Sequence, residues 1–446
     1  MISLASLELC FISVQAAAEV ARQPAVEVVQ WAVVEVVRQP SPFASLALGL
    51  PAVPSQHTHE LEFRTHERIS QIGASAWQTL VGEDCLPFLR YEWLSALEDT
   101  GCIEPDRGWL AMHVAAYENG ELVGIAPTYV KGNSEGEFVF DHAWARYAEG
   151  SLRREYYPKL IVAVPFTPAT GPRLLIKPGA DRERIARGFA EALKQIAERI
   201  SASSVHVLFP ERAQVAELTG AGYLERHGVQ FHWRNAGYQK FDDFLARFNS
   251  KRRNQIRREM REMKDRDVEI EVLTGKSLGP ERADFIFDFY RHTVEKFYYG
   301  RQYLNRAFFE QVCSTMPEHL HVVVASDASS KKPIAGAFNL LGRRALYGRY
   351  WGTLEERPFL HFNVCFYRGI EECIARGLDL FEPGAGGEHK LARGFEPSLT
   401  YSAHAFHDRR LGAAIAEFLG RERAAIEQHI AESKGESGLR ELGASV

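Results

Sequence analysis

The sequence predicts a mixed α/β or α+β protein built from two similar domains. Short apolar runs with a period of two lie between longer stretches that have the apolar spacing of helices. The order helix, hairpin, strand, helix, strand occurs in both halves, as a repeat of structure rather than of sequence. A length of 446 residues is typical of two to three domains. The composition, 46% hydrophobic and 25% charged, is that of an ordinary soluble globular chain.

Residues 1–60 differ from the rest of the chain. They form a Val-, Ala- and Pro-rich tract with little periodicity, which predicts a disordered or weakly helical leader. A docking segment is the alternative. The first twenty residues lack a basic start, and glutamates interrupt their apolar stretch, so a signal peptide is not expected. No apolar run reaches the roughly 18–20 residues of a membrane span.

The first ordered unit spans residues 61–238 and begins with a helical stretch at 76–99. The segment WLAMHVAAYENGELVGIAPTYV then predicts two strands around Asn119-Gly120, a dipeptide typical of hairpin turns. The proline-rich loop PFTPATGPR separates two further strands, and a helix and a strand complete the unit. These four elements are expected at 156–164, 173–176, 181–200 and 205–209.

The second unit spans residues 239–410 and repeats this plan. It begins with two helices, continues with three strands, and ends with a helix and a short strand. These elements are expected at 240–264, 281–299, 321–325, 334–341, 345–351, 361–376 and 378–382. Residues 411–446 are expected to form a terminal helix, at 411–433, and a polar tail.

Composition excludes several classes of function. The net charge is −5, so nothing global demands DNA or an anionic membrane, and only a peripheral membrane association stays open. The six cysteines form no C-x-x-C pair, so we expect no metal site and a reducing, cytoplasmic setting. The sequence also lacks the G-x-S-x-G, P-loop, H-E-x-x-H and strand-linked G-x-G-x-x-G motifs.

The strongest candidate site is the glycine-rich segment EPGAGGEHKLARGF at 382–395, which follows a predicted strand. Ionisable groups in a loop at a strand end are typical of ligand binding or catalysis. Glu388 and His389 are candidates for proton transfer, and Lys390 and Arg393 for holding anions. The alternative is a glycine turn with solvated charges. His361 is expected to face the same cleft, unless it caps its helix or lies in the core.

A second candidate is the basic helix in SKRRNQIRREMREMKDR, with Arg253, Arg257 and Arg258. Such a cluster suits the phosphates of a nucleotide cofactor, a tRNA or a lipid pyrophosphate. The alternative is a solvated helix in which Glu259 and Glu262 pair with the basic residues.

Two candidates lie in the first unit. Arg173 ends the stiff loop PFTPATGPR, where it either clamps an anion in a cleft or belongs to a structural turn. Asp141 lies in the aromatic-rich segment 136–160, which is either a pocket wall or an aromatic core with Asp141 capping a helix.

Several of these segments resemble the FemAB-like proteins over about residues 61–422. The resemblance rests on GEFVFDHAWA, PFTPATGPRLL, YGRYWG, LHFNVCFYRGIEECIARGL and FEPGAGGEHKLARGFEP. It implies tandem GNAT-like (acyl-CoA N-acyltransferase) domains with mixed central sheets. Tyr350-Trp351-Gly352 is similar to the aromatic-Trp-Gly strand of the Fem-type relatives. Lys390 is the counterpart of the lysine in their Phe-Lys-x-Gly-Phe motif, and SKRRNQIRR resembles their basic helix.

The sequence departs from the expected pattern at three places. Asn363 stands where a glutamate is expected after His-Phe, and Gly386 stands where a glutamine is expected. The segment 352–363 lacks the glycines that let a backbone approach the pyrophosphate of coenzyme A. These departures shift the expected base to Glu388 or to the substrate, and they put the use of acetyl-CoA in doubt.

The resemblance therefore implies an acyl or aminoacyl transferase, acting on an amine of a peptidoglycan precursor or another small molecule. Its donor would be acyl-CoA or aminoacyl-tRNA, and no metal is expected. Glu388 and His389 would transfer protons, and Tyr350 would donate to the leaving group. The expected substrate-binding residues are Lys390, Arg393, His361, Arg173, Trp351 and Asp141. The alternatives are a non-catalytic protein that binds a peptidoglycan precursor, and a tRNA-interacting module.

Overall fold

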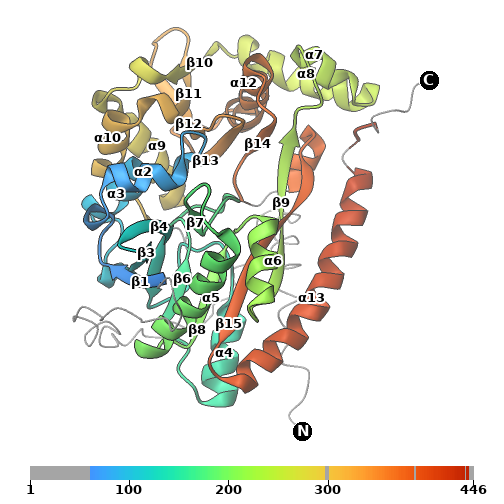
Figure 1. The fold of residues 1–446 in the computed structure, drawn as a ribbon. Helices are drawn as coiled ribbons and strands as arrows, with labels where there is room; N and C mark the ends of the chain where they lie inside the picture. Colours follow the sequence, from blue (N-terminus) through green and yellow to red (C-terminus); the bar gives the residue numbers. More distant parts are fainter. Residues whose placement is uncertain (1–60, 297–300, 386–387, 437, 441–446) are drawn as a thin grey trace.

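The computed structural model describes residues 61–296, 301–385, 388–436 and 438–440 (Figure 1). The predictions for residues 1–60 and for Gly386 lie outside these residues. The backbone of Glu388 is described, whereas its side chain is not, so its predicted role also lies outside the description.

Two sheets organise the described residues. A four-stranded sheet has the order β1-β3-β4-β7, and an eleven-stranded sheet has the order β10-β11-β12-β13-β14-β9-β15-β8-β6-β5-β2. The strands of the smaller sheet are β1 (Leu61–His66), β3 (His113–Glu118), β4 (Glu121–Ala126) and β7 (Leu175–Ile176). Those of the larger sheet are β2 (Trp109–Ala111), β5 (Thr128–Lys131), β6 (Lys159–Val162), β8 (Ser204–Leu208), β9 (Leu224–Arg234), β10 (Val268–Thr274), β11 (Leu320–Asp327), β12 (Pro333–Leu341), β13 (Ala345–Thr353), β14 (Leu380–Glu382) and β15 (Glu396–Phe406).

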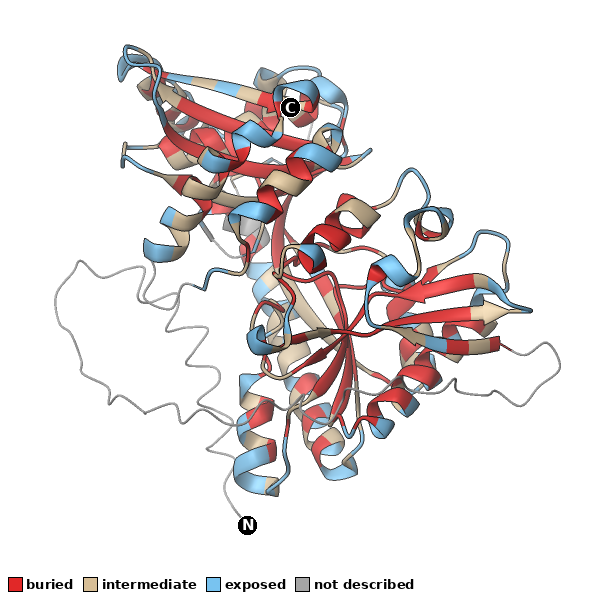
Figure 2. Ribbon diagram, turned by 90° about the vertical axis from the view of Figure 1, so that its left-hand side faces the viewer, coloured by how far each residue is buried: buried red, intermediate tan, exposed pale blue. Residues whose placement is uncertain are grey.

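The larger sheet is mixed. The pairs β13–β14 and β6–β8 are parallel, whereas the other named pairs are antiparallel. Helices cover these strands, and buried residues fill the strands and the inward sides of the helices (Figure 2). The prediction of a mixed α/β fold with mixed central sheets is therefore confirmed.

Two long strands join the halves of the chain. β9 pairs with β14 on one side and with β15 on the other, and β15 also pairs with β8. The chain thus returns from the second half into the sheet of the first half. The sequence predicted neither strand, because polar residues such as His227, Gln230 and Thr400 interrupt the alternation of apolar and polar residues that marks a strand. The division at residue 238 stays a prediction.

The helices differ from the predicted ones mainly in their interruptions. The described α-helices are α2 (Ala74–Val81), α3 (Tyr91–Asp99), α4 (His142–Tyr147), α5 (Arg182–Arg199), α6 (Arg212–Gly220), α7 (Phe241–Ala246), α8 (Ser250–Asp265), α9 (Ala283–Lys296), α10 (Arg306–Thr315), α11 (Leu360–Phe362), α12 (Arg368–Arg376) and α13 (Arg409–Glu436). The stretch predicted at 76–99 is two helices with a 3₁₀ turn, Pro87–Leu89, before the second, since a proline cannot continue a helix interior. The stretch predicted at 361–376 contains a π-helical turn, Asn363–Tyr367, between α11 and α12.

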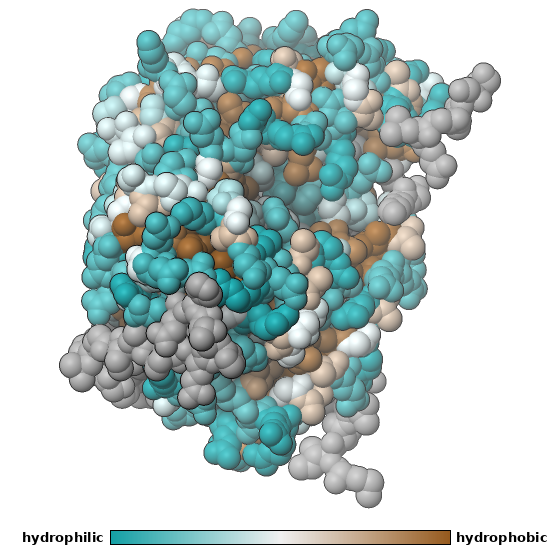
Figure 3. Space-filling model, viewed as in Figure 1, coloured by the Kyte–Doolittle hydropathy of each residue, from teal (hydrophilic) through white to brown (hydrophobic). Residues whose placement is uncertain are grey.

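The terminal helix α13 lies along both halves (Figure 1). Its first turns bury Leu411, Ile415 and Leu419 against Trp144 of the first half. Beyond its end, Arg440 accepts a 3.0 Å hydrogen bond from Arg247, which follows α7. The face seen in Figure 3 is largely hydrophilic, with apolar side chains in smaller patches. No helix among the described residues is long and apolar enough to cross a membrane.

Candidate active site

The candidate site lies where two parallel strands separate. β13 and β14 pair from Ala345↔Leu380 to Tyr347↔Glu382, and then β14 ends whereas β13 continues to Thr353. The chain after β14 passes so close to β13 that a Cβ atom on Gly348 would lie 3.1 Å from the Pro383 backbone. Gly384 has a φ of +90°, a conformation that favours glycine. The glycines therefore shape the opening between the two strands.

This opening holds a pocket of about 210 Å³. Its walls come from β12, from β13, from the π-helical segment and from the glycine-rich loop. The lining residues are Ala337, Asn339, Gly348, Arg349, Tyr350, Trp351, His361, Cys365, Phe366, Pro383, Ala385, His389 and Lys390. The structure thus brings together four predicted site residues, namely Trp351, His361, His389 and Lys390. Tyr350 also borders the pocket, but its ring packs against Tyr290 on the α9 side of β13.

Lys390 is the central cation of this pocket. It lies in the 3₁₀ helix Glu388–Arg393 and is only 4% exposed. Its Nζ donates hydrogen bonds to the carbonyl oxygens of Gly384, at 2.7 Å, and of Ala385, at 3.4 Å. Burial, together with the charge of Arg349, lowers its pKa to about 8. The ammonium is therefore held by the glycine-rich loop, and it remains largely charged at neutral pH.

His361 and His389 form the aromatic side of the pocket. Their ring centroids lie 5.7 Å apart, and His361 also lies 4.9 Å from the ring of Trp351. Burial is the main cause that lowers the pKa of each to about 4, and the positive charges of Lys390 and Arg393 add to it. Both imidazoles are thus neutral at neutral pH, and each can accept a proton.

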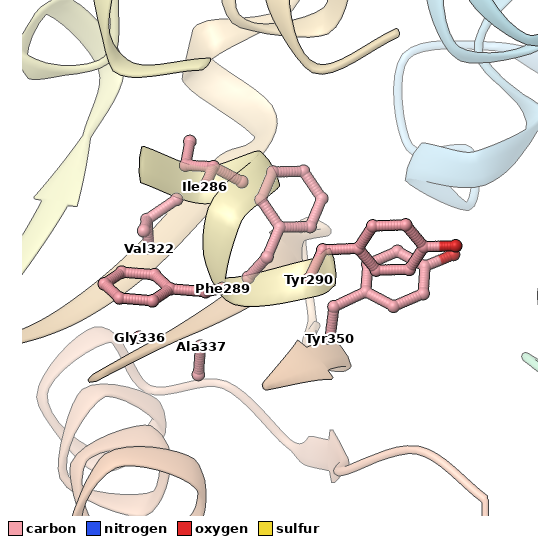
Figure 4. A pocket seen from close by; sticks show the side chains of 8 residues that line it. Ile286, Phe289, Tyr290, Val322, Gly336, Ala337 and Tyr350 are labelled. Atoms are coloured by element: carbon pink, nitrogen blue, oxygen red, sulfur yellow. The ribbon is translucent and has the colours of Figure 1, made fainter. Parts of the chain in front are cut away.

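Tyr350 also borders a smaller, apolar cavity of about 10 Å³ on the α9 side (Figure 4). Its ring lies 4.8 Å from that of Tyr290, and its hydroxyl has no hydrogen-bond partner among the described residues. Burial raises the pKa of this phenol well above its usual value, so it stays protonated. It is a proton donor without an assigned acceptor.

Arg393 does not face the pocket as a free cation. Its Nη2 donates 3.1 Å hydrogen bonds to both carboxylate oxygens of Glu259, on α8. Its Nη1 donates to the His389 carbonyl at 3.0 Å, and its guanidinium lies 3.2 Å from the centre of the Phe362 ring. The structure therefore corrects the predicted anion-binding role, because Arg393 connects the 3₁₀ helix to α8.

The basic helix α8 separates its charges by side. Glu259 is buried, where it accepts from Arg393 and from the Tyr367 hydroxyl. Arg257 and Arg258 are exposed, and Arg257 pairs with Asp242 at 2.8 Å. Arg253 is partly exposed. Glu259 is thus not the surface partner that the alternative interpretation required, and the exposed side of α8 is predominantly basic.

Arg173 is a structural residue in this fold. It is fully buried, and its guanidinium donates to the carbonyl oxygens of Leu208, Gly171, Pro172 and Ala169. These carbonyls fix the proline-rich loop against β8. The predicted anion clamp is therefore corrected, since its donors are already taken by backbone acceptors.

Asp141 lies away from the pocket, in a buried polar cluster of the first half. It accepts hydrogen bonds from Lys159 at 2.5 Å and from the Tyr156 hydroxyl at 2.8 Å. Burial opposes its ionisation, but Lys159 outweighs burial and lowers the pKa. Although Asp141 precedes α4, its side chain makes no capping hydrogen bond. The aromatic-core alternative describes it better than a pocket wall does.

Sequence reasoning missed Arg349 and Asn339, which line the pocket. It noted Asn363 only as a departure from the family pattern and did not predict its structural role. Asn363 donates to the carbonyls of Phe359 and Glu259, at 2.9 and 3.0 Å, so it joins the π-helical turn to α8. Arg349 lies within the YGRYWG segment that drew attention to β13. Neither the π-helical turn nor the irregular strand pairing at Arg349 has a local sequence signal.

Among the described residues, no group of three or more His, Cys, Asp or Glu side chains is arranged to hold a metal ion. The pocket is also smaller than the roughly 300–1,000 Å³ typical of sites for drug-sized ligands.

Comparison with solved structures shows similarities at low sequence identity. FemX matches with 12% identity, covering 78% of this chain and 99% of that chain, at a TM-score of 0.46. A tandem GNAT protein from the clavulanic acid biosynthesis pathway matches with 10% identity, covering 78% and 98%, at 0.41. L-PGS from Bacillus licheniformis matches with 9% identity, covering 66% and 85%, at 0.41. None of the curated proteins compared with the chain matches it.

The family model gives a firmer result, because it matches residues 68–441, which include both sheets almost entirely and the whole pocket. Its description is peptidoglycan biosynthesis and recognition. The chain therefore belongs to the FemAB-like family.

Proposed function

We propose that this protein is a transferase that moves an acyl or aminoacyl group onto an amine of a peptidoglycan precursor. The observation that carries the proposal is the pocket between β13 and β14, where Lys390 and two neutral histidines line one small cavity. Family membership supplies the link to peptidoglycan. The tandem GNAT-like organisation belongs to the same proposal.

The proposed reaction needs a base and a group that stabilises negative charge, and the pocket offers candidates for both. The acceptor amine attacks the acyl carbonyl, a C–N bond forms, and the amine proton passes to His389 or to Glu388. Lys390 stabilises the negative charge that develops on the carbonyl oxygen. The C–O or C–S bond to the donor then breaks, and the leaving atom takes up the proton that the base removed from the amine. The predicted donor Tyr350 is not used, because its ring packs against Tyr290 on the α9 side. His361 and Trp351 form the wall against which the acyl group packs.

The donor is the less defined partner. Since the pocket takes only the transferred group, the rest of the donor must lie on the surface. The exposed side of α8 suits phosphates, with seven Lys or Arg against three Asp or Glu along the helix. Acyl-CoA and aminoacyl-tRNA both remain candidates, and the protein is taken to act in the cytoplasm. If tRNA is the donor, replacing Arg258 with Ala should weaken tRNA binding. It should also reduce the slope of the logarithm of the binding constant against the logarithm of the salt concentration by about 1.

The test is a product assay with the purified full chain. Acyl-CoA thioesters and aminoacyl-tRNAs are each offered with amine-bearing muropeptides, and new amide products are measured by mass spectrometry. We expect product with one donor class and strongly reduced product for His389→Gln, whereas His429→Gln, an exposed change on α13, serves as the matched control. Absence of any amide product with both donor classes would contradict the transferase proposal.

A second candidate function is a non-catalytic precursor-binding protein. It is favoured by one observation, namely that both pocket histidines have pKa values near 4, which makes them weak bases. In that case muropeptides would bind without being converted to a product. Lys390→Met would then lower the affinity for muropeptides, and neither the wild type nor the variant would show transfer activity.

A further inference from the structure

Asn339 is a buried polar residue on the pocket side of β12. β11 and β12 pair regularly here, with Val322 opposite Phe338. The next pair along the ladder is His321 and Asn339. Val322 and Phe338 line the small apolar cavity on the α9 side, and side chains alternate between the two faces of a sheet. Asn339 therefore points to the opposite face, where it lines the larger pocket and is 4% exposed.

The helical segment that forms one wall of the pocket covers this face of the sheet. Ala337, two residues before Asn339, belongs to one buried apolar cluster with Leu360 and Val364 of that segment. His361, which lies between them in the sequence, lines the pocket. Asn339 and His361 thus border the same space, one from the sheet and the other from the helical segment.

His321 fixes the orientation of the Asn339 carboxamide. Nδ2 of Asn339 donates a 3.1 Å hydrogen bond to Nδ1 of His321, because an amide nitrogen can only donate. His321 is fully buried, and burial lowers its pKa to about 4, so the ring is neutral at neutral pH and Nδ1 can accept. The amide nitrogen of Asn339 is therefore directed toward β11.

The amide oxygen of Asn339 is left open to the pocket. When Nδ2 points toward β11, Oδ1 of the same planar amide points toward β13. The residue opposite Asn339 on β13 is Gly348, which has no side chain to fill this space. Within the described part of the chain, Oδ1 accepts no hydrogen bond, and it is not one of the enclosed atoms that lack a partner. The pocket thus contains a hydrogen-bond acceptor with a fixed direction.

We propose that Oδ1 of Asn339 accepts a hydrogen bond from an amide N–H of the substrate, and that His321 is the positioning residue that holds Oδ1 in this direction. The pocket thereby selects substrates with an amide N–H close to the reacting group. An amide oxygen pairs with an N–H and has nothing to offer an ester oxygen. The charged Lys390 in the same pocket disfavours a cationic amine at this place. The inference rests on the proposed function, because it takes this pocket as the substrate site, and it adds a substrate class.

The test measures equilibrium binding and therefore does not depend on transfer activity. N-propylacetamide and propyl acetate have nearly the same shape and differ in one N–H group, and each is titrated into the full chain by ligand-observed NMR. We expect the amide to bind about tenfold more tightly than the ester, a difference of about 1.4 kcal/mol. Asn339→Ala should abolish this preference, whereas Asn254→Ala, at an exposed residue of α8, should retain it.

The positioning role of His321 has its own readout. His321→Phe removes the acceptor of Nδ2, so the carboxamide of Asn339 is free to turn. This variant should reduce the preference for the amide and leave the affinity for the ester unchanged. An equal loss of affinity for both probes would mean that His321 only supports the fold.

A further variant keeps the test decisive if Asn339→Ala does not fold. Asn339→Asp retains an oxygen in the place of Oδ1, and His321 can donate to the other oxygen in its second tautomer, so the preference should remain. A preference lost in folded Asn339→Asp, equal binding of both probes to the wild type, no binding of either, or an unchanged preference in Asn339→Ala would overturn the assignment. Tighter binding of propylamine than of N-propylacetamide, lost in Asn339→Ala, would also overturn it. Failure of transfer with an intact amide preference would contradict only the proposed function.

Discussion

At the scale of single residues, the predicted cations differ in whether internal acceptors already occupy their hydrogen-bond donors. Arg173 and Arg393 are as cationic as Lys390 in the sequence, yet both are tied by internal acceptors. Lys390 is tied only to two carbonyls of the loop that forms the pocket wall. A cation in that position can turn toward a developing oxyanion at the cost of a hydrogen bond to the loop.

Replacing Lys390 with Met tests this role. Removal of one donor to an oxyanion typically lowers turnover by about 10²–10³-fold, and a loss of this size is expected here. Since the ammonium must be charged, wild-type turnover should also fall as the pH rises above about 8. The matched control is Lys331→Met, because Lys331 is exposed and pairs with Glu269 on the surface. Equal turnover in both variants would exclude Lys390 from the reaction.

At the scale of elements, the sequence predicted the regular pieces and missed the irregular ones. The helix α5 was predictable, because Asp181 caps its start and Ile185, Phe189, Leu193 and Ile196 repeat at helical spacing. The His389-Lys390 segment was predictable as a candidate site from its glycines and charges. The π-helical turn at Asn363 and the bulge at Arg349 depend on contacts with α8 and β12, which no local pattern records. The inward direction of Glu259 was equally hidden, since it lies among arginines in a charged run.

The contact of α8 with the pocket loop predicts a large effect from one carboxylate. Glu259→Gln leaves Arg393 buried without its counter-ion, and breaking such a pair typically costs about 3–5 kcal/mol of stability. Turnover should fall as well, because Arg393 also holds the His389 carbonyl. Urea unfolding and the transfer assay measure the two effects. Glu262→Gln, which breaks the partly exposed pair with Arg266, should cost about 0–1 kcal/mol. Similar costs for both variants would mean that the buried pair has no special role.

At the scale of the whole molecule, the two halves share one sheet and are not merely linked in sequence. β15 carries the chain from the pocket loop of the second half into the first half, where it pairs with β8. His404 of β15 lies opposite His206 of β8, and their Nδ1 atoms are 2.6 Å apart. Ser204 and Ser402 contact the outer ring nitrogens at 2.8 Å. Two buried imidazoles thus lie in direct contact at the junction.

This histidine pair predicts that acid weakens the junction. Burial lowers the pKa of His206 to about 3, with Lys159 and Arg226 adding to the effect and Asp141 opposing it. An unfolded histidine has a pKa of about 6.5, so the unfolded chain takes up protons that the folded chain refuses. The stabilisation is therefore complete above pH 6.5 and is lost as the pH falls toward 3.

Between pH 7 and 5, a single such histidine lowers the free energy of unfolding by about 2 kcal/mol. In urea unfolding, His206→Gln should reduce the loss of stability over this range by that amount, whereas the exposed His429→Gln should not. An unchanged pH slope in His206→Gln would mean that acid acts on the fold elsewhere, and that the junction between the halves does not depend on the neutral pair.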